Sequence, residues 1–185
     1  MRNCLMILAT VCSVFAVAAL ADPTTIPAAT GAIHISGAVA QPSDWTNDQL
    51  KTQFASQIQS IDYASHGQKH TANAVPLVAL LKSAGVSIDS KEDPKADPKT
   101  KNAALRIVVV VRGTDGYTVA LSLADILPAI GNQPAWLALD VDGAPLRANE
   151  SPAKLILPSD AKPGRWVRGV ASISILDVNT LAPQP

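Results

Sequence analysis

The chain has 185 residues, and its 15 basic and 15 acidic side chains give a formal net charge of zero. This balance argues against a nucleic-acid partner, because proteins that bind nucleic acid usually carry a strong basic excess. Hydrophobic residues make up 48% of the chain, which excludes disorder over most of its length and predicts a globular domain.

Residues 1–21 have the pattern of a secretion signal. Arg2 supplies a positive start, an apolar stretch runs to about Leu20, and Ala19-Leu20-Ala21 is a small-residue cleavage site. The alternative is an uncleaved membrane anchor, but the apolar stretch is slightly short for a span. We expect export to the periplasm or the cell exterior, a mature chain that starts at Asp22, and no membrane partner after cleavage.

Both cysteines, Cys4 and Cys12, lie within this signal. The mature chain would therefore have no thiol and no disulfide, so packing alone must hold it together. Loss of Arg2 with the signal leaves 15 − 1 = 14 basic residues against 15 acidic ones, a formal charge of −1.

The first part of the mature chain predicts a strand, a short helix and a second strand. Residues 22–31 are rich in Pro, Thr and Ala and predict a loose leader. Alternating apolar positions over residues 33–39 predict a half-buried strand. Thr46-x-x-Gln49 is a capping box that opens a short helix, and residues 57–64 predict a further extended segment.

The middle of the chain predicts a helix, a loop and a strand. Pro76 fits the first position of a helix that ends at Gly85. The charged, Pro-containing run over residues 90–102 predicts an exposed, mobile loop. Residues 105–111 are a nearly unbroken β-branched run, which predicts a strand buried on both faces.

The last part of the chain predicts a β-rich ending. Residues 113–116 form a turn signal, and residues 117–121 would pair back as a hairpin. Ser122 to Asp125 is a second capping box that predicts another short helix. Further strands are predicted at residues 136–141, 155–157 and 170–175.

A few short helices on a mixed, β-rich core predict an α+β fold. We expect one domain over residues 32–178, followed by a tail at residues 179–185.

Several short stretches stand in an order and spacing that suggest a family. They are Ile35-Ser36-Gly37, Val75-Pro76-Leu77, Asp115-Gly116-Tyr117, Ser122-Leu123-Ala124-Asp125, Asp142-Gly143, Leu157-Pro158 and Arg165-Trp166-Val167-Arg168. Together they resemble the stand-alone sulfite-oxidase-type domain, the oxidoreductase molybdopterin-binding domain family. The resemblance implies the mixed α+β sulfite-oxidase fold, and it makes a molybdopterin the cofactor to test.

In catalytic members of that family, a cysteine follows the second strand and its thiolate binds molybdenum. The matching stretch here, from Asp62 to His70, has no cysteine. A hydroxyl or an imidazole does not replace a soft thiolate without changing the metal chemistry. The resemblance therefore implies the fold without the family's metal site.

The same stretch supplies three polar candidates for a ligand pocket: Ser65, His66 and His70. The two histidines are four residues apart, a spacing that can bind zinc on a helix. Gly67 and its polar neighbours indicate a solvated loop instead, and no third ligand is near in the sequence. We therefore predict no metal site.

Lys162, Arg165 and Arg168 place three cations within seven residues. The resemblance implies that this region contributes to binding the pterin phosphate, and arginine offers paired donors to an anion. The alternative is a salt-bridged surface segment. A pocket between residues 62–70 and 162–168 would bring these groups together, and the Tyr117 hydroxyl could contribute to it.

Three functional readings stay open. We expect an exported, non-catalytic binding or accessory module, with a small anionic ligand or a partner protein. The alternative is a periplasmic molybdopterin-dependent oxidoreductase or subunit with a non-cysteine site. A third reading is an anion or small-molecule sensor domain. The sequence identifies no catalytic residue.

Overall fold

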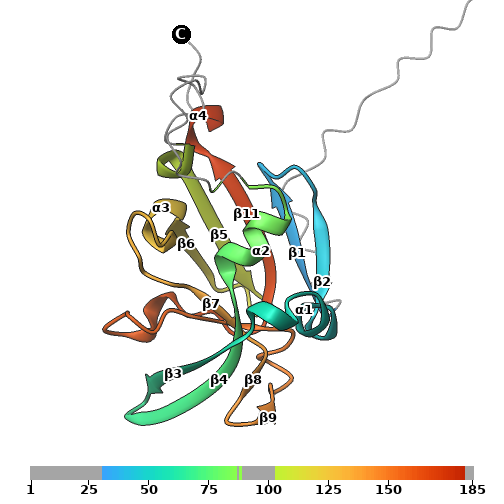
Figure 1. Ribbon diagram of the computed structural model, residues 1–185, viewed down its shortest axis with the longest axis vertical. Helices are drawn as coiled ribbons and strands as arrows, with labels where there is room; N and C mark the ends of the chain where they lie inside the picture. Colours follow the sequence, from blue (N-terminus) through green and yellow to red (C-terminus); the bar gives the residue numbers. More distant parts are fainter. Residues whose placement is uncertain (1–30, 87, 89–102, 182–185) are drawn as a thin grey trace, which may run out of the picture.

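The computed structural model describes residues 31–86, 88 and 103–181 (Figure 1). The predicted signal, most of the predicted leader, the charged run at 90–102 and the last four residues lie outside the described residues. Within the described ranges, no helix is long and apolar enough to cross a membrane.

The larger sheet has five strands in the order β2-β1-β11-β5-β6. Their bounds are β1 Ala32–Gly37, β2 Ser43–Thr46, β5 Ile107–Gly113, β6 Thr118–Ser122 and β11 Val170–Asp177. Strand β1 runs parallel to β11, while the other neighbours are antiparallel. The sheet is therefore mixed, and it joins the start of the domain to its end.

The smaller sheet has four antiparallel strands in the order β10-β7-β4-β3. Their bounds are β3 Gln59–Ser65, β4 Gln68–Pro76, β7 Trp136–Ala138 and β10 Lys154–Ile156. A short ribbon of β8 Asp140–Val141 and β9 Ala144–Pro145 follows β7. The β3–β4 hairpin extends away from the larger sheet (Figure 1).

Short helices fill the connections. The α-helices are α1 Asn47–Gln53, α2 Leu77–Ser83, α3 Leu123–Ile126 and α4 Val178–Leu181. Three 3-10 turns are η1 Ala55–Gln57, η2 Ala103–Arg106 and η3 Pro163–Arg165. Helix α4 includes residues 179–181, which the sequence assigned to the tail. Helix α2 packs Leu77, Leu80 and Leu81 into the main core.

Buried side chains form two clusters. The main core draws on both sheets and includes Ile33, Val109 and Leu155. A second, smaller cluster lies on the other face of the smaller sheet and includes Ile61 and Tyr63. The candidate site described below lies against this second cluster.

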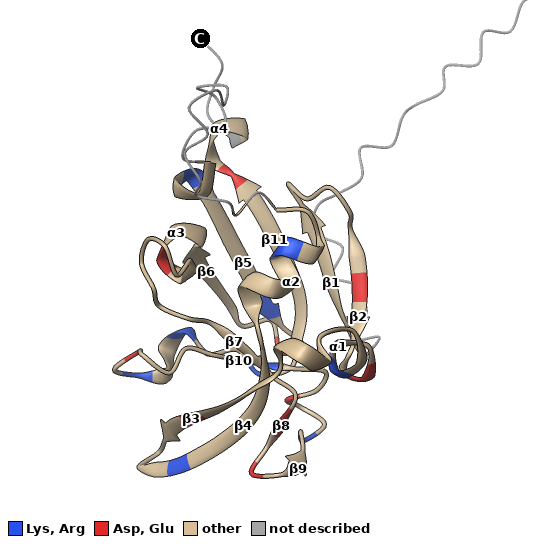
Figure 2. Ribbon diagram, in the orientation of Figure 1, with Lys and Arg blue, Asp and Glu red and all other residues tan. Residues whose placement is uncertain are grey.

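Charged residues of both signs are interleaved along the fold (Figure 2). The sheets themselves are held by apolar packing, since no buried residue of the described chain is charged and the phenol of Tyr63 is the exception among otherwise apolar buried side chains.

The capping box at Thr46 is confirmed, because the Thr46 side chain accepts from the Gln49 N–H and the Gln49 side chain accepts from the Thr46 N–H. The second capping box is wrong: the Ser122 side chain makes no capping hydrogen bond. Ser122 is the last residue of β6, with ψ at 132° against 164° at Thr46, and the third helix residue is Asp125, which is shorter than the Glu or Gln of a capping box.

Two predicted boundaries and one predicted burial pattern need correction. Helix α2 begins at Leu77, because Pro76 still pairs as part of β4. Strand β5 begins at Ile107, after Leu105 in an exposed turn. Strand β5 also buries one face fully and the other only in part, with Ile107, Val109 and Val111 on the inner face.

Candidate functional site

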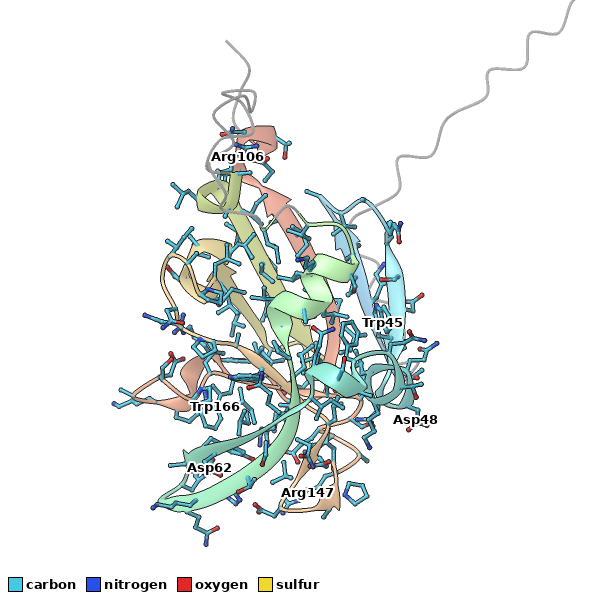
Figure 3. The ribbon with its side chains drawn as sticks, in the orientation of Figure 1. Trp45, Asp48, Asp62, Arg106, Arg147 and Trp166 are labelled. Atoms are coloured by element: carbon cyan, nitrogen blue, oxygen red, sulfur yellow. The ribbon has the colours of Figure 1, made fainter. Side chains whose placement is uncertain are left out.

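A cavity of about 750 Å³ opens beside the smaller sheet. Its lining comes from the β3–β4 hairpin, the β8–β9 ribbon, the loop that follows this ribbon, the 115–117 turn and residues 163–168. Figure 3 shows Arg147 and Trp166 in this region, at the opposite end of the molecule from Arg106. The predicted pocket between residues 62–70 and 162–168 therefore exists, and residues 141–154 supply much of its wall.

The hairpin itself differs from the predicted loop. Strand β4 continues from Gln68 to Pro76, so His70 lies on a strand and pairs with Tyr63. The turn consists of His66 and Gly67, both with positive φ, at 52° and 77°. Gly67 suits such a turn, and histidine is among the few other residues that adopt this conformation regularly.

Tyr63 is the most enclosed side chain of the cavity's polar groups, at 6% exposure. Its ring stacks on His70 at 5.4 Å, and it meets Trp166 edge-on at 5.3 Å. The Lys154 ammonium lies 5.8 Å from the ring centre. Burial, followed by the charges of Asp142 and Glu150, raises the pKa of the Tyr63 phenol to about 12.

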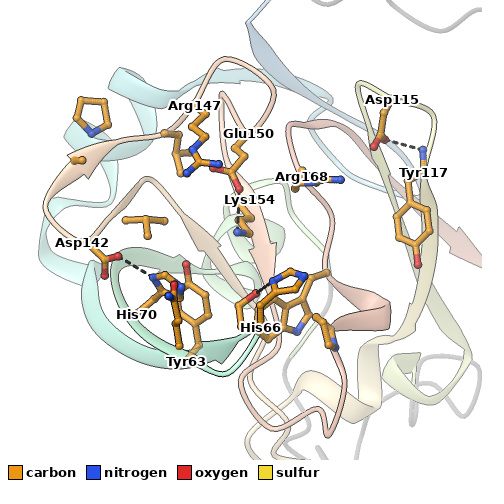
Figure 4. A pocket seen from close by; sticks show the side chains of 18 residues that line it. Tyr63, His66, His70, Asp115, Tyr117, Asp142, Arg147, Glu150, Lys154 and Arg168 are labelled. Carbon is orange, nitrogen blue, oxygen red and sulfur yellow. Dashed lines mark hydrogen bonds and ion pairs between the residues drawn. The ribbon is translucent and has the colours of Figure 1, made fainter.

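His70 is oriented by a carboxylate. Its Nδ1 lies 2.8 Å from Asp142 Oδ2, and the other oxygen of Asp142 accepts from the Thr71 N–H at 2.9 Å. The hydrogen bond from His70 holds the pKa of Asp142 below its usual range. At the hairpin tip, Ser65 Oγ lies 3.0 Å from His66 Nδ1. Figure 4 shows both imidazoles at the cavity wall.

Arg147 and Arg168 line the cavity as exposed cations. Within the described part of the chain, neither has an ion-pair partner. The backbone of Arg147 is fixed by a turn in which the Glu150 N–H donates to the Arg147 carbonyl at 2.8 Å. Arg168 is placed by the paired Val167 on one side and by Gly169, whose carbonyl accepts from the Thr114 N–H, on the other.

Lys154 and Glu150 form a partly buried ion pair in the same wall, at 3.0 Å, with exposures of 14% and 15%. Each of these charges therefore has a partner. Among the cavity's cations, this leaves Arg147 and Arg168 as the pair able to bind an external anion.

Two of the predicted basic residues lie outside the cavity. Arg165 is in a two-point ion pair with Asp160, in which Nε donates to Oδ2 at 2.9 Å and Nη2 pairs with Oδ1. This contact raises the pKa of Arg165. Lys162 is exposed and does not line the cavity. Of the three predicted cations, Arg168 alone lines the cavity, and Asp160 already holds the Arg165 guanidinium.

Tyr117 lines the cavity, but its hydroxyl has a structural role. It donates to the Gly164 carbonyl at 2.6 Å and so ties the 113–116 turn to η3. The Tyr117 N–H donates to Asp115 Oδ1 at 2.9 Å. Of the predicted candidates, Ser65, His66, His70, Tyr117 and Arg168 are brought together here.

The donor set does not fit a cysteine-ligated molybdenum. The lining offers imidazoles, carboxylates, two phenols, an ammonium and guanidinium groups, but no thiolate. Within the described residues, no group of three or more His, Cys, Asp or Glu side chains is placed to hold a metal ion. The two arginines do fit an oxyanion, since guanidinium groups pair with such groups through two parallel hydrogen bonds.

No family model and no curated protein sequence matches the chain. A solved structure does: the sulfane dehydrogenase SoxCD from Paracoccus pantotrophus, with a TM-score of 0.52 and 18% identity. The fold is of the sulfite-oxidase type. This confirms the predicted α+β class, and at this identity the similarity concerns the fold alone. The match covers 79% of this chain and only 38% of that one.

Proposed function

We propose that this chain is an exported, non-catalytic binding module that holds a small organic oxyanion in the cavity beside the β3–β4 hairpin. The observation that carries the proposal is the pair Arg147 and Arg168, which line the cavity without an ion-pair partner among the described residues. The absence of a thiolate from the lining supports a binding role over oxygen transfer.

The charges of the cavity support an anion as its ligand. Lys154 is neutralised by Glu150, and Asp142 is occupied by His70 and the Thr71 N–H. Asp115 accepts from the Tyr117 backbone. An arriving oxyanion would therefore meet two uncommitted guanidinium groups in a partly enclosed site, where charge-assisted hydrogen bonds are strong.

Export is supported by the signal pattern of residues 1–21 and by the cysteine-free composition that follows it. Mass spectrometry of the protein from its native cells tests this part. A mass that begins at Asp22 agrees with export, while a retained signal contradicts it.

Anion binding is tested by isothermal calorimetry with a phosphate monoester. In the double variant Arg147→Ala and Arg168→Ala, affinity should fall by about 1.5–3 kcal/mol for each charged hydrogen bond lost. The unfolding midpoint should stay close to that of the wild type, because both side chains are exposed.

The matched control is Lys51→Ala with Lys162→Ala, which removes the same charge from exposed positions outside the cavity. This control should bind the monoester as the wild type does, apart from a small general electrostatic loss. Equal affinity in the cavity variant and the wild type would reject the proposal.

The alternative is an oxidoreductase, or a subunit of one, that holds a molybdopterin through a non-cysteine ligand or a partner. The fold shared with a sulfane dehydrogenase favours it. An oxidoreductase of this kind would contain stoichiometric molybdenum when purified from native cells, whereas a binding module without a metal ligand would contain none.

A further inference from the structure

Tyr63 presents an unpartnered hydroxyl to the cavity. His70, Trp166 and Lys154 enclose its ring, so the side chain has one orientation. Within the described part of the chain, the hydroxyl has no hydrogen-bond partner, although Tyr63 lines the cavity. The hydroxyl oxygen is accessible from the cavity, since it is not among the fully buried atoms of the described residues that lack a partner. A phenol that stays neutral to about pH 12 is a hydrogen-bond donor throughout the physiological range.

The neighbouring His70 offers the complementary group. Its Nδ1 faces the Asp142 carboxylate, which can only accept, so Nδ1 carries the proton in the neutral imidazole. Nε2 is then an acceptor, and within the described residues it has no partner. The stacked rings therefore carry a donor on one side chain and an acceptor on its neighbour, with their centroids 5.4 Å apart.

We propose that Tyr63 and His70 form a second recognition point, which reads a neutral hydroxyl or amide group on the same ligand whose oxyanion binds Arg147 and Arg168. This inference rests on the proposed function and specifies its ligand class. A hydroxyl accepts from the Tyr63 O–H and donates to His70 Nε2, whereas a fully deprotonated anion such as sulfate has no proton to donate.

The two recognition points lie on different sides of the cavity. Figure 4 shows Tyr63, His70 and Asp142 together at one side, with Arg147 and Arg168 across from them. A cavity of about 750 Å³ has room for an organic molecule that spans both points. The ligand class is therefore an organic phosphate, sulfate or carboxylate with a hydroxylated or amide-bearing body.

The test uses two probes of equal chain length, hexitol phosphate and hexyl phosphate. They share the oxyanion and differ in the hydroxyl groups of the chain. Calorimetry on the wild type should give about fivefold to tenfold tighter binding of hexitol phosphate. In Tyr63→Phe, which removes only the hydroxyl and leaves His70 in place, this ratio should fall by about threefold, while hexyl phosphate binds as before.

A ratio that is the same in Tyr63→Phe and the wild type, or a wild type that does not prefer hexitol phosphate, would overturn the inference. If both probes bind and depend on Arg147 and Arg168, the proposed function survives that result. If neither probe binds the wild type, the proposed function and this inference fail together. Because the readout is a ratio, a small loss of folded protein in the variant does not alter it.

Discussion

Enclosure by aromatic and charged neighbours sets the ionisation of Tyr63. Desolvation is the largest cause of the raised pKa, and the nearby carboxylates of Asp142 and Glu150 add to it. The folded-state pKa of about 12 exceeds the ordinary value of 10.0, so the unfolded chain releases this proton first. The stabilisation is complete below pH 10 and is lost as the pH rises toward 12.

The chain has two tyrosines, which makes this ionisation measurable. In Tyr117→Phe the remaining tyrosine is Tyr63, and ultraviolet absorbance should show phenolate formation centred near 12 rather than near 10.0. Circular dichroism over the same titration identifies the pH range in which the protein is folded. A midpoint near 10 in folded protein would show that Tyr63 is open to water.

Arg165 and Arg168 have different roles although only two residues separate them. Arg165→Ala would leave Asp160, whose side chain is 11% exposed, without its partner. We expect the free energy of unfolding to fall by about 1–3 kcal/mol. Arg168→Ala removes an exposed side chain and should change it by less than about 0.5 kcal/mol. Chemical denaturation of both variants checks this, and equal losses would contradict the assignment.

Among the elements, the two capping sequences show that a local sequence pattern does not by itself determine whether a capping hydrogen bond forms. Thr46 and Ser122 both end a strand and are paired in the larger sheet, Thr46 with Ala32 and Ser122 with Val108. Their backbones differ, with ψ at 164° for Thr46 and 132° for Ser122, and only the Thr46 side chain makes the capping bond. The third helix residue also differs, because Gln49 is long enough to reach back to the cap, whereas Asp125 has a shorter side chain than the Glu or Gln of a capping box.

Alanine substitution measures this difference. Thr46→Ala should lower the free energy of unfolding by about 1 kcal/mol, since it removes a capping hydrogen bond. Ser122→Ala should cost less than about 0.5 kcal/mol, because no capping bond is lost. Thermal or chemical unfolding of both variants provides the values. A larger loss for Ser122→Ala would mean that a cap forms there after all.

Strand β4 explains why the candidate site was only partly predictable. Its inward residues near the site are Ala72 and Ala74, which give a weak alternation signal, and its other residues there are polar. The sequence therefore predicts a loop where the longest strand of the smaller sheet lies. With that strand missing from the prediction, Tyr63 could not be paired with His70.

The cavity wall also depends on long-range contacts. Arg147 and Asp142 reach the hairpin through the β8–β9 ribbon, a contact that no local pattern encodes. The general position of the pocket was predictable from the family resemblance, and so was Arg168. The ion pair between Arg165 and Asp160 was not predictable, since it depends on the path of the loop between the two residues.

At the scale of the whole molecule, two carboxylates link stability to acid pH. Hydrogen bonds from His70 and Arg106 lower the pKa values of Asp142 and Asp177 below the ordinary 3.8. The unfolded chain therefore takes up these protons first as the pH falls. The stabilisation is present above the ordinary carboxyl pKa and is lost as the pH drops through the folded-state values.

Unfolding midpoints measured between about pH 5 and pH 2 should therefore decrease toward acid. Asp177→Asn should start from a lower midpoint and lose less of it over this range, because one depressed carboxyl is gone. A wild-type midpoint that stays constant over the range would show that neither ion pair persists in solution.

We propose that this sulfite-oxidase-type fold, whose cavity lacks a thiolate, is a metal-free module for an organic oxyanion. Elemental analysis and native mass spectrometry of the protein purified from its own cells and compartment test this proposal. We expect molybdenum far below one atom per chain and, where a ligand is retained, the added mass of an organic acid or phosphate. One molybdenum per chain, carried with a pterin, would contradict it.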